Sequence, residues 1–225
     1  MFTYSLDKVL MRVYNICIDI QKCVYLLLFG GVMNKKLNTK QITMGAILTA
    51  LVIILQLLGQ FVRFGPFQVS LVLVPIVIGA ASCGVAVAGW LGFVFGLVVL
   101  LNGDAAAFLA VNAFGTVLTV LLKGIACGVL AGIVYKLVSK KSKYLAVVLA
   151  AIVCPLTNTG VFLIGCLVFF MDTVAMWGEG LGYANTAEYV FLGLVGGNFL
   201  FELVTNIVLS PVVVKLLDFG KKIRR

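Results

Sequence analysis

The sequence contains no histidine and no phosphate-binding loop of the GxxxxGKS or GxxxxGKT type. Histidine is the commonest metal ligand and a frequent general base, and the phosphate loop is the usual cradle for the phosphates of ATP. We therefore expect that the chain does not hydrolyse ATP by itself. A membrane enzyme would need a nucleophile with its base, or a metal site, and the sequence shows neither.

Charged residues are also scarce. Only 11% of the 225 residues are charged and 63% are hydrophobic, whereas soluble domains have roughly 25% charged and 45–50% apolar residues. Mean hydropathy is +1.19. Because a membrane-spanning helix needs about 20 mostly apolar residues, the chain has room for about six of them. The composition therefore excludes a soluble domain and predicts an all-α membrane protein.

Cysteines are few and scattered. None of the six follows the CxxC spacing that would bring two thiolates to one metal ion. We interpret them as small apolar packing residues. No metal or other cofactor is expected to be bound by this chain.

Six apolar runs are candidate membrane spans. They cover roughly residues 42–62, 68–82, 84–101, 107–137, 144–170 and 188–217. The formal net charge is +9, and the basic residues lie in short clusters between these runs. Such clusters mark cytoplasmic segments, so they predict a six-transmembrane-helix bundle with both termini cytoplasmic, and not nucleic-acid binding.

The first 32 residues differ from the rest of the chain. They mix charged and apolar residues irregularly, and the run at 24–32 is too short to cross a bilayer. Met33 opens an ordinary cytoplasmic beginning, MNKKLNTKQ. We therefore divide the chain into an N-terminal extension, residues 1–32, and a six-helix membrane domain, residues 33–225. The extension is either a start-site artefact or a loose amphipathic segment.

Polar side chains recur at helical spacing in the last three predicted spans. Burying them in lipid is costly, roughly 2.5–3.5 kcal/mol for a lysine at a helix centre, so they face protein or water. Spacings of three and four residues place each set on one helix face. The sets are Asn112, Thr116, Thr119 and Lys123 in the fourth span, Thr157, Asn158 and Thr159 after Pro155 in the fifth, and Asn198, Glu202 and Asn206 in the sixth.

These polar groups have two interpretations. In the first, spans four to six wall a site for a polar solute, because Lys123, Asn158 and Glu202 fall at similar depth. In the second, Lys123 and Glu202 form a buried ion pair and the amides join the helices. Arg63, at the outer end of the first span, is a rim contact or an interfacial anchor. Trp177 lies in a Gly-rich outer loop, residues 171–187, which is a lid or an ordinary connection.

Small residues recur at every fourth position in three spans. Such faces permit close helix approach, and their usual meaning is packing inside the bundle. The faces consist of Ala46 and Ala50 in the first span, Ala88, Gly92 and Gly96 in the third, and Gly124, Gly128 and Gly132 in the fourth.

Five segments, in this order and spacing, resemble a known transporter family. They are MNKK followed by AILTA, then FGPFQVSLVLVPIVIGA, LLKGIACGVLAG, CPLTNTGVF and NFLFELVTNIVLSPVV. From Met33 onward the chain resembles the substrate-specific S components of energy-coupling factor (ECF) vitamin transporters. The resemblance implies a six-helix protein of the prokaryotic cytoplasmic membrane that captures a vitamin near its outer face.

The resemblance also implies partners. An S component docks on a transmembrane scaffold (T) subunit that carries two ATPase (A) subunits, and these partners would use the ATP. The family's docking motif, AxxxA, maps onto Ala46 and Ala50. Metal-ion members rely on histidine, so an organic solute is expected here, either zwitterionic or carboxylated like pantothenate, or a hydroxylated heterocycle like pyridoxine. The alternative is a self-sufficient secondary transporter or channel with Lys123 and Glu202 as an ion relay.

Overall fold

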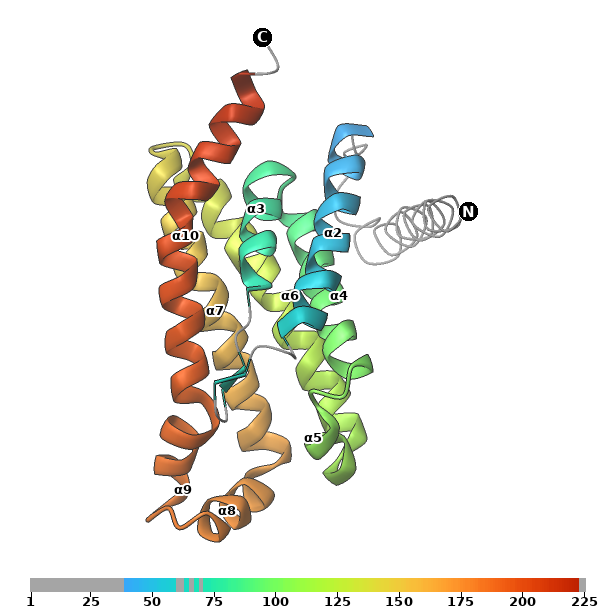
Figure 1. Cartoon of the computed structure of the whole chain (residues 1–225), viewed down its shortest axis with the longest axis vertical. Coiled ribbons are helices and arrows are strands. Elements are labelled where there is room, and N and C mark those ends of the chain that lie inside the picture. Colours follow the sequence, from blue (N-terminus) through green and yellow to red (C-terminus); the bar gives the residue numbers. More distant parts are fainter. Residues whose placement is uncertain (1–38, 60–62, 65–66, 69–70, 223–225) are drawn as a thin grey trace.

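The computed structural model describes residues 39–59, 63–64, 67–68 and 71–222, which form a bundle of helices (Figure 1). The proposed extension, residues 1–32, lies outside the described residues. The elements in chain order are α2 (Thr39–Gly59), β1 (Arg63–Phe64), β2 (Phe67–Gln68), α3 (Leu73–Ser82), α4 (Val85–Leu101), α5 (Ala106–Val111), α6 (Ala113–Val138), α7 (Lys143–Phe169), α8 (Met171–Gly180), α9 (Thr186–Glu188), the π-helix η1 (Tyr189–Gly196) and α10 (Gly197–Lys222).

In the part of the chain that the structure describes, four helical segments are long and apolar enough to cross a membrane. They are Gln41–Gly59, Ala113–Val138, Lys143–Phe169 and Thr186–Lys215. The last of these joins α9, η1 and α10. Each overlaps a predicted span, so the prediction of an all-α membrane protein is confirmed.

The second and third predicted spans correspond to shorter helices. Helix α3 has 10 residues, which at about 1.5 Å per residue gives about 15 Å, half of the hydrocarbon thickness of a bilayer. Part of the predicted span at 68–82 lies outside α3, because Phe67 and Gln68 pair with Phe64 and Arg63 in a short antiparallel hairpin. Helix α3 is packed among α2, α4, α6, α7 and α10, which explains its apolar sequence.

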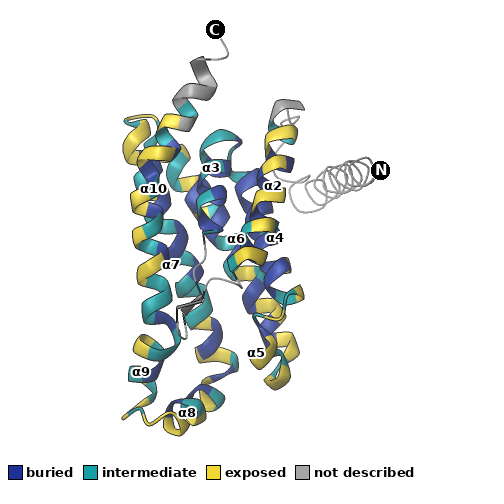
Figure 2. Ribbon diagram, viewed as in Figure 1, coloured by how far each residue is buried: buried dark blue, intermediate teal, exposed yellow. Residues whose placement is uncertain are grey.

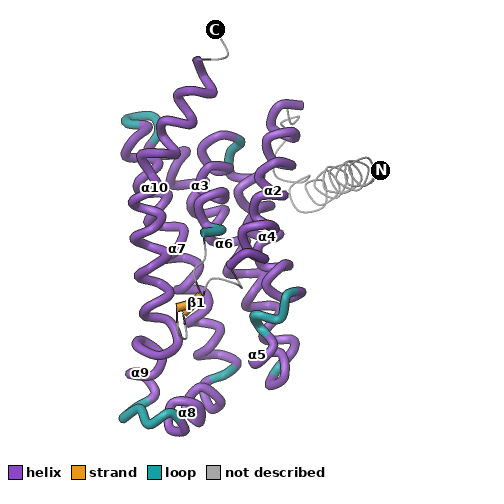
Figure 3. The backbone as a smooth tube through the Cα atoms, in the orientation of Figure 1, coloured by secondary structure: helices purple, strands orange, loops and turns teal. Residues whose placement is uncertain are grey.

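The two ends of the described bundle carry different charges. The first residues of α2, the turn between α6 and α7, and the end of α10 lie at one end of the molecule (Figures 1 and 3). Helices α5, α8 and α9 lie at the other. Lys140 and Lys141 belong to the α6–α7 turn and Lys143 begins α7, whereas Glu179 and Glu188 belong to α8 and α9.

Helices α4 and α6 approach closely along their small residues. A Cβ atom added to Gly92 would collide with the main-chain carbonyl oxygen of Gly124, and one added to Gly128 would collide with that of Ala88. A Cβ on Gly132 would lie 2.8 Å from the Cα of Val85. The small-residue faces of the third and fourth predicted spans therefore pack against each other, as expected for internal packing.

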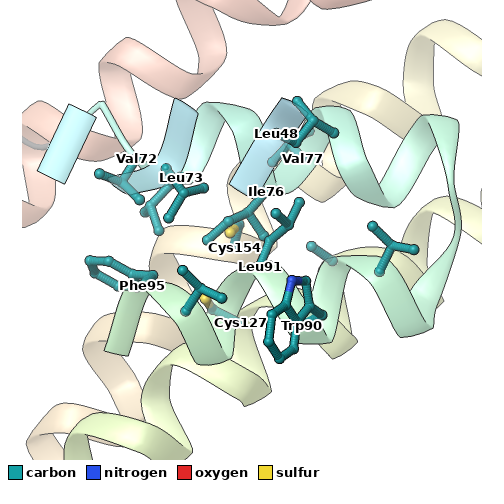
Figure 4. Packing of buried hydrophobic residues seen from close by; sticks show 14 of the residues in the cluster. Leu48, Val72, Leu73, Ile76, Val77, Trp90, Leu91, Phe95, Cys127 and Cys154 are labelled. Atoms are coloured by element: carbon teal, nitrogen blue, oxygen red, sulfur yellow. The ribbon is translucent and has the colours of Figure 1, made fainter. Parts of the chain in front are cut away.

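The main apolar core lies between α2, α3, α4, α6 and α7. Its side chains include Leu73, Ile76 and Leu91, which are fully buried, and the thiols of Cys127 and Cys154 (Figure 4). Trp90 donates its indole N–H to the hydroxyl of Thr49 at 3.0 Å and so joins α4 to α2. The outer faces of α2, α7 and α10 remain exposed and apolar, as the surface of a membrane bundle requires (Figure 2).

The segment predicted as an outer loop, residues 171–187, is largely helical. Helix α8 covers Met171–Gly180 and buries Val174 and Gly178 on one face. That face packs on Tyr189, whose side chain lies about 3.0–3.3 Å from a Cβ position on Gly178. The prediction of a loop for these residues was wrong. Val174 and Gly178 are four residues apart and share one helix face, but the surface that buries this face is known only from the tertiary structure.

Candidate solute-binding site

A cavity of about 250 Å³ opens between the helices, towards the end of the bundle that carries α5 and α8. One water molecule occupies about 30 Å³ of the liquid, so the cavity has the volume of about eight waters. Its polar lining consists of Gln56, Asp104, Thr116, Thr119, Lys123, Asn158, Thr159, Asn198 and Glu202. The apolar lining consists of Phe95, Val99, Ala105, Phe108, Val120, Phe162, Phe170, Leu194, Val195 and Phe199.

Helix α6 contributes three of the predicted residues to the cavity. Thr116, Thr119 and Lys123 follow one another at spacings of three and four residues, so they form a stripe on one face of α6, and Thr119 in this stripe meets α7. The Thr116 hydroxyl donates to the main-chain oxygen of Asn112 at 2.8 Å. Thr119 packs on Gly165 of α7, where a Cβ atom would collide with its side chain.

Helices α7 and α10 contribute the other polar groups near the middle of the bundle. Asn158 is 6% exposed and Glu202 is 3% exposed. The amide of Asn158 lies close enough to the Glu202 carboxyl group to interact with it. Asn198 lies one turn before Glu202 on α10, and both line the cavity.

Lys123 and Glu202 do not form a direct salt bridge. Both residues belong to the described part of the chain, and no contact of 4.0 Å or less joins their charged groups, although the two charges interact. The Lys123 ammonium group lies 5.3 Å from the ring centre of Phe162 and 5.7 Å from that of Phe95. These rings stabilise the cation by cation–π attraction, and both Lys123 and Glu202 line the cavity.

Phenylalanine side chains form the end of the cavity nearest α5 and α8. Phe108 meets the ring of Phe162 edge to face at 5.6 Å and that of Phe170 at 5.1 Å. Trp177 of α8 packs on Phe108 from outside, with ring centres 5.3 Å apart. The cavity is thus aromatic at this end and polar around Lys123 and Glu202.

Other predicted site residues lie away from the cavity lining. Asn112 caps α6, since its side chain accepts from the main-chain N–H of Gly115 at 2.9 Å. Asn206 donates to the main-chain oxygen of Glu202 at 2.8 Å, within α10. Thr157 is half-buried on α7 but is not among the lining residues. Trp177 supports the aromatic end from behind.

Arg63 belongs to β1, but its side chain lies outside the described part of the structure. That any of the predicted residues contacts a solute stays a prediction.

Two polar lining residues were missed by reasoning from sequence. Gln56 of α2 donates to the carboxylate of Asp104 at 2.7 Å, and both line the cavity. Gln56 is a lone polar residue inside an apolar run, which is a signal that could have marked it. Asp104 follows α4 and was counted only as a charge of an outer loop, because nothing in the sequence shows that this turn folds back towards α2.

A comparison with protein families matches residues 40–217 to the model described as "ECF transporter, substrate-specific component". This chain belongs to that family. The match covers every helix that lines the cavity and ends within α10. The family consists of transporter subunits that bind the substrate. Comparisons with curated proteins and with solved structures give no match.

The residues assigned to docking in this S component differ in exposure. Ala46 is 1% exposed and therefore faces the interior of the bundle. Ala50, one turn later on α2, is exposed beside Leu51 and Ile54. The AxxxA segment thus packs inside the bundle at its first alanine and offers only its second to another molecule.

Proposed function

We propose that this S component captures a small organic metabolite of vitamin size in its cavity, for uptake across the cytoplasmic membrane of a prokaryote. The cavity itself is the observation that supports this most directly. Pockets for drug-sized ligands measure about 300–1,000 Å³, and the volume of about 250 Å³ lies just below that range, so it suits a molecule smaller than a typical drug. Solutes resembling pantothenate or pyridoxine have this size and are rich in hydroxyl groups.

Buried polar atoms without partners support binding of a solute. Among the described residues, no hydrogen-bond partner is found for the Thr119 hydroxyl, the Asn158 side-chain oxygen or the Asn198 side-chain oxygen. Leaving such a group unsatisfied costs about 1–3 kcal/mol. Three of them around one cavity are typical of a site that a polar molecule completes.

The arrangement of charges supports an orientation in the membrane. Lysines gather at the end that holds the α6–α7 turn and the end of α10, and the positive-inside rule places this end in the cytoplasm. The aromatic end of the cavity then faces outside. In this arrangement six apolar helices form the bundle, with both chain ends cytoplasmic and α3 crossing only part of the bilayer.

The direct test is solute binding by the purified full chain without ATP. Native mass spectrometry identifies a metabolite retained through purification, and calorimetry with that metabolite compares two variants. Asn158→Ala should weaken binding by about 1–3 kcal/mol, because it removes a partner from the cavity. Thr157→Ala, at the neighbouring position outside the lining, should leave the affinity unchanged. Equal affinities for both variants would place the site elsewhere.

The second part of the proposal is docking on a T subunit that carries two ATPase subunits, which use the ATP. Ala50→Trp on the exposed face of α2 should leave solute binding intact and abolish uptake by cells. Ile164→Trp, at a position 60% exposed on α7, is the matched control and should preserve uptake. Loss of solute binding in Ala50→Trp would show that this position belongs to the bundle's own packing.

A further inference from the structure

Most of the unpartnered buried atoms of the cavity are hydrogen-bond acceptors. An amide oxygen can only accept hydrogen bonds, and two of the three unpartnered atoms are the side-chain oxygens of Asn158 and Asn198. The side chain of Asn158 interacts with the Glu202 carboxyl group, and its oxygen is left without a partner among the described residues. The Thr116 hydroxyl already donates its proton to the main chain and can only accept from a solute. Two amide oxygens of the lining, those of Asn158 and Asn198, therefore need a donor from the solute.

The charges of the cavity favour the same kind of molecule. Two carboxyl groups, those of Asp104 and Glu202, line it, and Lys123 is the only basic residue among the lining residues that the structure describes. The ammonium group of Lys123 is already stabilised by the rings of Phe95 and Phe162 and by the charge of Glu202. A solute with a carboxylate would meet this lysine only beside a like charge, and like charges in contact cost affinity.

The shape of the apolar part favours a planar ring. Phe108 meets Phe162 and Phe170 edge to face, and all three side chains line one end of the cavity. Flat aromatic molecules pack on such surfaces with about 0.5–1.5 kcal/mol beyond the area that they bury. The polar groups of the solute would then point towards Asn158 and Glu202.

From these three observations we propose that the cavity selects a planar heterocycle that carries hydroxyl or amino donors and has no net negative charge. This inference rests on the proposed function, since it names the class of solute for the same site. It favours the pyridoxine-like solute over the pantothenate-like one.

Matched pairs of probes test the inference with the detergent-purified full chain. Nicotinamide and nicotinate share one ring and differ in a carboxamide against a carboxylate, and pantothenol and pantothenate differ in an alcohol against a carboxylate. Calorimetry should give at least tenfold tighter binding for the neutral member of each pair, and pyridoxine should bind more tightly than pantothenol. Tighter or equal binding of either carboxylate overturns the inference.

A pair of variants attributes the preference to the cavity. Glu202→Gln removes one carboxyl group from the lining. It should reduce the ratio of the affinity for nicotinamide to the affinity for nicotinate at least threefold. Glu179→Gln removes an exposed carboxylate of α8 and should leave the ratio unchanged. A ratio that does not respond to Glu202→Gln overturns the inference.

The failure of this inference differs from the failure of the proposed function. If none of the five probes binds while native mass spectrometry finds a retained metabolite that carries a net negative charge or has no planar ring, the inference is overturned and the proposed function stands. If no metabolite is retained and no probe binds, both are overturned.

Discussion

The contact between α4 and α6 allows a quantitative prediction for one added methyl group. In Gly124→Ala the new Cβ would collide with the main-chain carbonyl oxygen of Gly92 and lie 3.1 Å from its carbonyl carbon. Main-chain atoms cannot rotate away as the tip of a flexible side chain would, so the two helices must move apart. The matched control is Gly160→Ala on α7, where an added Cβ has no neighbour within 4 Å.

The two substitutions share one local effect and differ in one tertiary effect. Alanine is favoured over glycine inside a helix by about 1 kcal/mol, which both variants gain. Overpacking costs about 1–3 kcal/mol, and a rigid neighbour places Gly124→Ala at the upper end. We expect Gly160→Ala to gain about 1 kcal/mol and Gly124→Ala to lose about 2 kcal/mol. For a chain of this size, 1 kcal/mol shifts the midpoint of thermal unfolding by about 2–4 °C. The midpoint should therefore rise by about 2–4 °C in Gly160→Ala and fall by about 4–8 °C in Gly124→Ala.

Thermal unfolding in detergent can be measured through the buried cysteines. Cys127 and Cys154 are 0% exposed, and Cys127 lies one turn beyond Gly124 on α6, so a thiol-reactive dye reports the opening of this contact. A Gly124→Ala midpoint equal to or above that of the unmodified protein would refute the close approach of α4 and α6. A Gly160→Ala midpoint well below it would show that glycine is required at this position for a reason other than space.

Two further predictions concern the cavity wall and the core. Gly165→Ala should push the Thr119 side chain towards the cavity, because the new Cβ occupies the space of that side chain. The affinity for the solute, measured by calorimetry, should fall at least threefold. An unchanged affinity would mean that α7 shifts instead. Trp90→Phe removes the 3.0 Å hydrogen bond to Thr49 and should lower the free energy of unfolding by about 1 kcal/mol. The affinity for the solute should not change. A changed affinity would show that the α2–α4 contact affects the geometry of the cavity.

Helical periodicity in the sequence located much of the candidate site. Spacings of three and four residues predicted which side chains of α6 and α10 share a face, and Thr116, Thr119 and Lys123 do line one cavity with Asn198 and Glu202. Periodicity describes a single helix, so it identified these side chains but not the residues of other helices that contact them. It also gave Asn112 and Asn206 the same weight, although the local main chain satisfies both.

The residues that the sequence did not reveal depend on contacts between distant segments. Gln56 and Asp104 are 48 positions apart, and only the packing of α2 against the turn after α4 brings them within 2.7 Å. Helix α8 was predicted as a loop for the same reason, because its apolar face is defined by Tyr189 of another element.

Composition and periodicity by themselves determined that this protein is a helical membrane bundle, and they selected the helix faces that carry polar groups. Those properties are local, since they follow from the cost of placing polar and charged atoms in lipid and from the helical repeat. Only the tertiary structure decided that Lys123 and Glu202 line one cavity without forming a salt bridge, because they belong to different helices, α6 and α10, whose packing the helical repeat does not determine.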